Sequence, residues 1–421
     1  MDAVVIPAKR SISKREDTIA AWCGIVWFCL IIDACYTWFL PDLVRNLLGT
    51  ISVLCGTAIL ARNNGVVLSK QRRKAFFAVL LLAFFMIVVK FKAFFVFIYI
   101  PLLCILQWRD TALSKMYSYF KNFIIFYAIL SILIEILVVA RLWQHLPLVK
   151  IYEPQDWVQE GLGYVNYFYG FFCIPAANTS LTFYRACGPL KEGGHFIFFL
   201  SFVYLAELIV YKRRNIWLIL CGILTLSPNF LVLFLMAEIY SAIKNKSWFK
   251  TFLTIAGIAL GAIFLFVLSP ENIKDEVIRI IFERMLEESV ENMGSDGIMA
   301  ILDGRTGDNS IAMYHNFLNS GVLEKLIGVN NFDGDDMMSD YRWLLMYCGF
   351  GGTALILWCS YKCAFLHERS LLGLCVLIIA VVAFLQRAWM FIQVYIWIMM
   401  LLVTNEYNIS QKYHKCVFES K

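Results

Sequence analysis

Long apolar runs follow one another along this chain, and they constrain its fold more than any other feature. A helix that crosses a bilayer needs about 20 apolar residues, and twelve stretches approach this length, several of them falling short. They cover residues 20–40, 43–61, 75–89, 93–108, 122–142, 194–211, 216–227, 229–243, 251–268, 343–361, 371–385 and 388–404. Of the 421 residues, 60% are hydrophobic and 16% charged, whereas soluble domains have about 25% charged residues. The chain is therefore predicted to be an all-α polytopic membrane protein with about 12 transmembrane helices.

Some of these stretches are interrupted. The pairs 75–108 and 371–404 are typical of helical hairpins, and the tip of the second is polar at Gln386 and Arg387. The stretch 216–243 is broken between Thr225 and Asn229. Because Pro228 has no backbone N–H to donate, we expect the chain to pause there partway through the bilayer.

Basic residues predict the orientation. With the N-terminus in the cytoplasm, 23 of the 37 Lys and Arg residues lie on the cytoplasmic side, and each cytoplasmic segment has at least two. This distribution follows the positive-inside rule. It predicts a multi-pass membrane protein with both termini cytoplasmic.

Two segments then face outward and are long enough to hold a site. The longer one, 269–340, contains 15 acidic and five basic residues. The predicted organisation is an N-terminal bundle (1–142), a medium outer loop (143–193), helices with a broken hairpin (194–268), a large acidic outer loop (269–342), C-terminal helices (343–404) and a cytoplasmic tail (405–421). In the medium loop, Cys173 and Cys187 could pair in an oxidising compartment, which their spacing leaves open.

The most informative motif is the stretch 183–196, which leads into an apolar run. Its pair Gly193-Gly194 is typical of a turn. Glu192 stands at the predicted helix start, where the helix dipole favours an acid. With Arg185 and Lys191 nearby, this boundary could bind an anion at backbone N–H groups. The alternative is that the two cations are interfacial anchors and Glu192 an ordinary N-terminal cap.

Two further motifs lie in the large acidic loop. Arg305 either forms a local salt bridge or faces Arg185, so that two planar guanidinium groups hold a pyrophosphate. Asp340 and Arg342 precede the next span, where they form a structural pair or contribute to the site. The cluster 333–336 lacks the later Glu of a calcium loop, and no metal site is predicted.

In this order, the motifs resemble those of O-antigen and capsular polysaccharide polymerases of the Wzy type, within the O-antigen ligase/polymerase superfamily. That family has an Arg-x-x-Gly string ending in Glu-x-Gly before a span, an Arg in the large outer loop, a Leu-Ile-Gly turn, and an acidic or His residue before a Gly-x-x-Gly span. The matching positions are Arg185, Gly188, Glu192, Gly194, Arg305, Leu326 to Gly328, Asp340, Gly349 and Gly352. The similarity covers roughly 120–400.

The resemblance implies a glycosyltransferase with a fold like that of the GT-C class. It would polymerise undecaprenyl-pyrophosphate-linked oligosaccharide repeats on the periplasmic face of the bacterial inner membrane. It would do so without a metal, other cofactor or nucleotide sugar, and without nucleic acid as a partner. Besides the bilayer, a chain-length regulator and a flippase are the implied partners. Arg185 and Arg305 would bind the pyrophosphate with Lys191 or Arg342 assisting, and Glu192 or Asp340 would be the base.

Other functions stay open. Superfamily ligases, which transfer the finished glycan to an acceptor, have a His where this chain has Asp340, and this difference favours the polymerase. A lipid-linked oligosaccharide flippase would also be polytopic, but it would concentrate ionisable residues at the bilayer midplane and often shows internal repeats. Here the polar motifs lie outside the spans, and no repeat is found.

Overall fold

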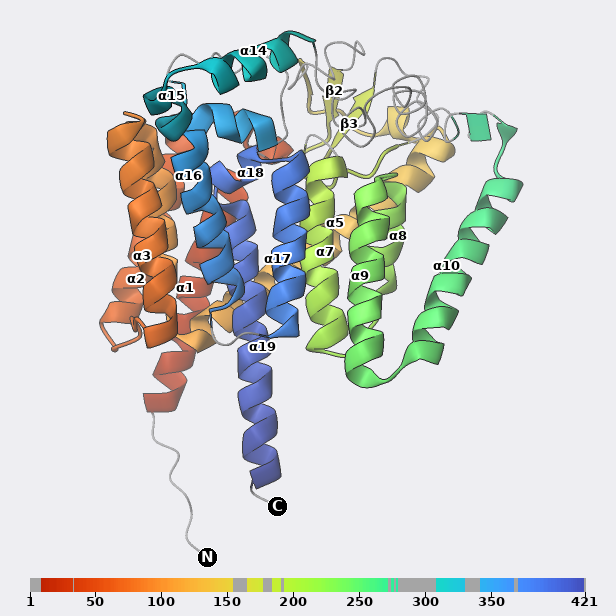
Figure 1. The fold of residues 1–421 in the computed structure, drawn as a ribbon. Coiled ribbons are helices and arrows are strands. Elements are labelled where there is room, and N and C mark those ends of the chain that lie inside the picture. The colour runs from red at the N-terminus through yellow and green to blue at the C-terminus, as the bar shows by residue number, and fades with distance from the viewer. Residues whose placement is uncertain are drawn as a thin grey trace, which may run out of the picture. The chain divides into compact units, whose positions relative to one another are not determined.

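The computed structural model describes residues 9–32, 34–153, 165–176, 184–190, 193–271, 274–275, 278, 308–329, 341–366 and 370–419, most of which are helical (Figure 1). Each of the twelve predicted apolar stretches overlaps a described helix. Among the described residues, four helices are long and apolar enough to cross a membrane: Asp42–Ala61, Asp110–Val139, Trp248–Leu268 and Tyr341–Ala364. These helices agree with an all-α membrane protein, while the number of crossings stays a prediction.

The chain forms two compact units. Unit 1 comprises residues 1–124, 350–384 and 389–421. Its helices are α1 (Lys9–Ile31), α2 (Asp42–Ala61), α3 (Lys70–Phe84), α4 (Val96–Ile105), the first half of α5 (Asp110–Val139), the second part of α16 (Tyr341–Ala364), α17 (Leu371–Gln386), α18 (Trp389–Ile392) and α19 (Tyr395–Glu419).

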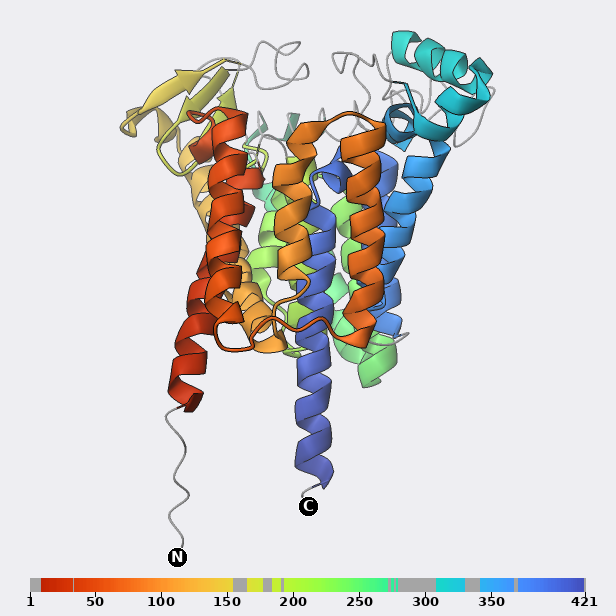
Figure 2. The same cartoon turned by 90° about the vertical axis from the view of Figure 1, so that its left-hand side faces the viewer.

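Small residues allow α1 and α2 to pack closely (Figure 2). A Cβ atom at Gly49 would lie 2.7 Å from the Trp27 ring, and one at Gly56 would lie 3.0 Å from Cys23 Cβ. The Ser52 hydroxyl donates a hydrogen bond of 3.0 Å to the Cys23 carbonyl. Small and hydroxyl residues are the usual contacts between helices in a membrane, because burial against lipid-like neighbours gives little driving force there.

A buried polar network joins α3, α5 and α19 in unit 1. The Arg72 guanidinium pairs with Asp110, donates to the Trp108 carbonyl, and lies 3.3 Å from Asn405 Oδ1. Asn405 in turn donates to the backbone carbonyl of Asp110 over 3.1 Å. Arg72 is one of the 23 basic residues that the positive-inside rule assigns to the cytoplasmic side, yet only 2% of its side chain is exposed. Its local role is therefore to connect three helices.

Replacing Arg72 by Met should destabilise the protein, because Asp110 and the Trp108 carbonyl lose their charged donor. Removing one partner of a buried ion pair costs about 3–5 kcal/mol. Thermal unfolding of the purified protein in detergent measures the loss. Arg73→Met is the control, since Arg73 is exposed; equal unfolding temperatures for the two variants would contradict the role of the network.

Unit 2 comprises residues 125–349 and 385–388. After the second half of α5 come strands β1 (Lys150–Tyr152), β2 (Val165–Phe168) and β3 (Cys173–Ala176), and then α7 (Gly193–Ile209), α8 (Ile216–Leu224), α9 (Pro228–Asn245), α10 (Trp248–Leu268), α14 (Asp308–Asn319), α15 (Val322–Ile327) and the first part of α16.

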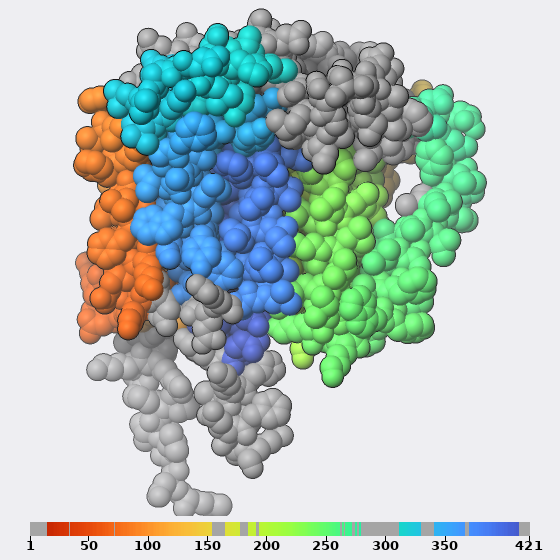
Figure 3. All heavy atoms as spheres, in the orientation of Figure 1, coloured from red at the N-terminus to blue at the C-terminus, as the bar shows by residue number. Residues whose placement is uncertain are grey.

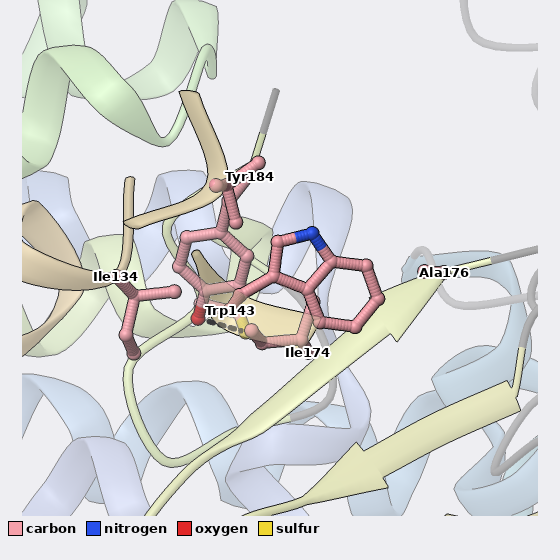
Figure 4. Close-up of a cluster of buried hydrophobic side chains, with 7 residues drawn as sticks. Ile134, Trp143, Ile174, Ala176 and Tyr184 are labelled. Atoms are coloured by element: carbon pink, nitrogen blue, oxygen red, sulfur yellow. Dashed lines mark hydrogen bonds between the residues drawn. The ribbon is translucent and has the colours of Figure 1, made fainter. Parts of the chain in front are cut away.

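The three strands form an antiparallel sheet that the sequence analysis did not predict. β1 pairs with β2 and β2 with β3, with Ile151 opposite Tyr167 and Tyr167 opposite Ile174. A cluster of buried side chains joins this sheet to α5 (Figure 4), consisting of Ile134, Val138, Trp143, Ile174, Ala176, Tyr184 and Cys187. Strands of three or four residues contain too few alternations for a sequence pattern to reveal them.

Candidate functional site

The helix interruption predicted near Pro228 lies between α8 and α9. α8 ends at Leu224, Leu226 has a left-handed φ of 46°, and α9 begins at Pro228. Pro suits the first position of a helix because its missing N–H has no partner to bond there. The two helices meet closely at Gly222, where a Cβ atom would lie 2.2 Å from the Phe230 ring. A side chain at this position would push α8 and α9 apart.

Arg185 binds directly to this interruption. Its Nε atom donates a hydrogen bond of 2.7 Å to the Thr225 carbonyl, and the backbone N–H of Ala186 donates to the Leu224 carbonyl over 3.1 Å. These carbonyls lie at the C-terminal end of α8, which carries the negative end of the helix dipole. The half-buried Arg185 side chain therefore caps the C-terminal end of α8, at the interruption that precedes α9.

The N-terminus of α7 reaches the same place. The sequence analysis predicts Gly193-Gly194 as a turn, whereas both residues begin α7 and are buried. A Cβ atom at Gly193 would lie 2.7 Å from the Ala186 carbonyl oxygen and 3.4 Å from that of Thr225. Gly at this position thus lets the helix start approach both segments. The N-terminal end of α7 and the Arg185 side chain therefore both approach the Thr225 carbonyl. A helix N-terminus and a guanidinium are each groups that bind anions in other proteins.

A buried carboxylate that the sequence analysis missed holds this segment. Glu135 of α5 accepts a hydrogen bond of 2.7 Å from the backbone N–H of Tyr184, the neighbour of Arg185. The Tyr184 hydroxyl lies 3.0 Å from Cys187 Sγ, and burial raises the pKa of this phenol well above its ordinary value. Cys187 and Cys173 are not joined by a disulfide. The sequence signal that could have identified Glu135 is the presence of an acidic residue inside an apolar run.

A second polar contact reaches the start of α9. The Asn229 side-chain amide donates to Gln386, the last residue of α17, in the stretch Leu385–Ala388 that belongs to unit 2. Arg387 follows and is half-buried. From the sequence, Gln386 and Arg387 are predicted only to form the polar tip of a hairpin. Their place beside the α9 N-terminus depends on a contact across 157 residues of sequence.

Of the other predicted site residues, only Arg342 is described. It lies in the first turn of α16, is 3% exposed, and its guanidinium carbon is 5.9 Å from the centre of the Tyr341 ring. The contacts that hold Arg185 and those given for Arg342 involve different elements. Lys191, Glu192, Arg305 and Asp340 lie outside the described residues. Among the described residues, no group of three or more His, Cys, Asp or Glu side chains could hold a metal ion.

The Leu-Ile-Gly turn, Leu326 to Gly328, is in direct contact with the Gly-x-x-Gly span that begins at Gly349. Gly328 ends α15 with φ 80°, and Gly349 interrupts α16 with φ 66°. A Cβ atom at Gly349 would lie 2.4 Å from Gly328 N, and Val329 N–H donates to the Met346 carbonyl over 2.8 Å. The span predicted over 343–361 is therefore two helical segments, because the backbone at Gly349 leaves the helical conformation to make this contact.

Helix α10 stands apart from the rest of unit 2. Only 6% of its apolar window is buried, against 39–56% for the other three long apolar helices. It is held near its start, where Thr251 Oγ1 lies 3.2 Å from Glu238 Oε2 and Glu238 pairs with Arg214 at 2.8 Å. Figure 3 shows α10 diverging from α9 beyond this point. The apolar sides of both helices are exposed as a result.

Comparison with known proteins identifies no relative: no family, curated protein or solved structure matches the chain.

Replacing Gly222 by Ala should destabilise unit 2, because the new methyl group overlaps the Phe230 ring. Overpacking of this kind costs about 1–3 kcal/mol. Thermal unfolding in detergent measures the change. Gly257→Ala on α10 is the matched control, because no atom lies within 4 Å of the added methyl group. If Gly222→Ala unfolds at the temperature of the unaltered protein, the close approach of Gly222 to the Phe230 ring is contradicted.

Glu135→Ala should release the segment that contains Arg185, because the buried Tyr184 N–H loses its acceptor. An unsatisfied buried donor costs about 1–3 kcal/mol. Glu135→Gln keeps an acceptor oxygen and should behave like the unaltered protein. Hydrogen exchange at the Tyr184 amide distinguishes them: exchange accelerates in Glu135→Ala only. Equal acceleration in both variants would show that the negative charge, rather than the acceptor, holds the segment.

Proposed function

We propose that this chain is a polymerase that joins lipid-linked oligosaccharide repeats at a membrane surface. The observation that carries the proposal is the position of Arg185, whose guanidinium lies at the interruption between α8 and α9 beside the start of α7. An arginine near a helix N-terminus suits a pyrophosphate, because guanidinium and backbone N–H groups both donate to phosphate oxygens. The surrounding apolar helices suit a polyprenyl carrier.

In the proposed reaction, a hydroxyl oxygen of the acceptor sugar attacks the anomeric carbon of the donor glycan. The bond between that carbon and the pyrophosphate oxygen breaks, and its electron pair leaves with the pyrophosphate. Arg185 stabilises the negative charge on the leaving group, with Arg305, Lys191 or Arg342 assisting. Glu192 or Asp340 accepts the hydroxyl proton. The sequence resemblance assigns these last five residues.

The Gln386–Arg387 segment adds a second cation to the proposal. Asn229, at the start of α9, donates a hydrogen bond to the Gln386 side chain. Arg387 is the next residue in the chain after Gln386. Arg387 could therefore supply the second guanidinium that the sequence analysis sought at Arg305. The divergent apolar faces of α9 and α10 would accommodate the isoprenoid tail beside the headgroup.

Replacing Arg185 by Gln should shorten the surface glycan of cells that depend on this chain. Gln Nε2 has the same number of bonds from Cα as Arg Nε, so the donor to Thr225 can be kept while the charge is lost. Removal of one donor to a developing negative charge lowers a rate by about 100- to 1000-fold. Gel separation of the glycan ladder measures the effect, and single repeats should accumulate.

Arg141→Ala is the control for this experiment, because Arg141 is an exposed arginine after α5. Its ladder should match that of unaltered cells. A normal ladder from stably folded Arg185→Gln would exclude the proposed role of Arg185. Long chains stranded on the carrier lipid would instead identify a ligase, and repeats confined to the inner leaflet would identify a flippase.

A further inference from the structure

Helix α15 presents an apolar face that the described residues leave uncovered. The exposed fractions are 85% for Val322, 67% for Leu323 and 53% for Leu326. The three positions share a side of the helix by their spacing. Such a contiguous group, on a segment joined by short turns to α14, differs from the scattered apolar residues of an ordinary protein surface.

The backbone of α15 is fixed in place. Its last turn lies against Gly349: a Cβ atom at Gly349 would be 2.5 Å from the Leu326 carbonyl oxygen. The preceding helix α14 packs through Phe317 onto Met346, with Trp343 beside this pair. Helices α14 and α15 and the first part of α16 thus form one packed group, and the apolar face of α15 is held at the level of Gly349.

The length of α16 indicates that Gly349 lies within the thickness of the bilayer. Gly349 directly precedes the second part of α16, which runs through Lys362, its first basic residue. The helix from Phe350 to Lys362 is about 20 Å long at 1.5 Å per residue, whereas the hydrocarbon core is about 30 Å thick. With the Lys362 ammonium at one bilayer surface, Gly349 does not reach beyond the opposite surface. The α15 face beside it is therefore at the depth of lipid.

The neighbouring aromatic residues agree with this depth. Trp343 and Tyr347 stack in the first part of α16 with ring centres 4.9 Å apart. Trp and Tyr are enriched where a membrane protein passes through the headgroup region. The charged residues Glu324 and Lys325 lie between the apolar positions of α15, as expected for a helix that lies in the interface with one side in the lipid.

We propose that α15 is a membrane-interface anchor, with Val322, Leu323 and Leu326 inserted into the leaflet at the Gly349 end of α16. This inference does not depend on the proposed enzymatic function. It would hold the end of the large acidic loop at the membrane surface. The partner is the lipid itself, because the Gly328–Gly349 contact places the exposed side chains at its depth.

Spin labelling tests the depth of α15. A ketone-reactive nitroxide is attached after Leu323→p-acetylphenylalanine, which avoids the 13 native cysteines. The protein is placed in nanodiscs of phosphatidylcholine and phosphatidylglycerol. Relaxation by oxygen, which concentrates in lipid, should exceed relaxation by a water-soluble nickel chelate. Labels at Lys212, in the exposed turn between α7 and α8, and at Leu260 of α10 give the aqueous and lipid references.

Adding Val322→Asn to the labelled chain should raise nickel accessibility at position 323, because a polar side chain weakens insertion. Ala312→Asn, on the exposed side of α14, should leave it unchanged. Dominant nickel accessibility at position 323 in the unaltered background would overturn the proposal by placing α15 in water. Low accessibility to both reagents would overturn it too, since protein would then cover this face.

Discussion

Backbone carbonyls at an interrupted helix need hydrogen-bond donors, and unit 2 is organised around this requirement. In apolar surroundings an unpaired carbonyl costs several kcal/mol. Arg185 and the N–H of Ala186 supply donors to Thr225 and Leu224 at the end of α8. The segment before α7 is therefore part of the broken helix pair, although about 40 residues of sequence separate them.

The same requirement explains where small side chains occur. Gly193 lets α7 begin against the Ala186 and Thr225 carbonyls, and Gly222 lets Phe230 lie on α8. Glu135 holds Tyr184 from the other side. Arg185 satisfies the Thr225 carbonyl, which the N-terminal end of α7 also approaches, so structural and chemical demands meet at Arg185. A substitution of Arg185 therefore changes both the pairing of the Thr225 carbonyl and the positive charge available to an anion.

Much of the helical framework could be predicted, and much of the site could not. The lengths of the apolar runs identify helices because burial in lipid requires continuous hydrophobicity, and Pro228 marked the interruption correctly. Arg185 was predicted from the residues around it. Glu135 and Gln386 were not, because each acquires its role from a partner far away, Tyr184 and Asn229 respectively. The sheet was missed because its strands are short.

By itself, the sequence determined that the chain consists mainly of apolar helices. It also determined the position of the interruption between α8 and α9, and that Arg185 lies shortly before the start of an apolar helix. These properties depend on local composition and on the missing N–H of proline. Only the tertiary structure decided that Gly328 and Gly349 touch, that α16 is divided, and that α10 diverges from α9. Such contacts depend on the close approach of two backbones, which neither segment encodes alone.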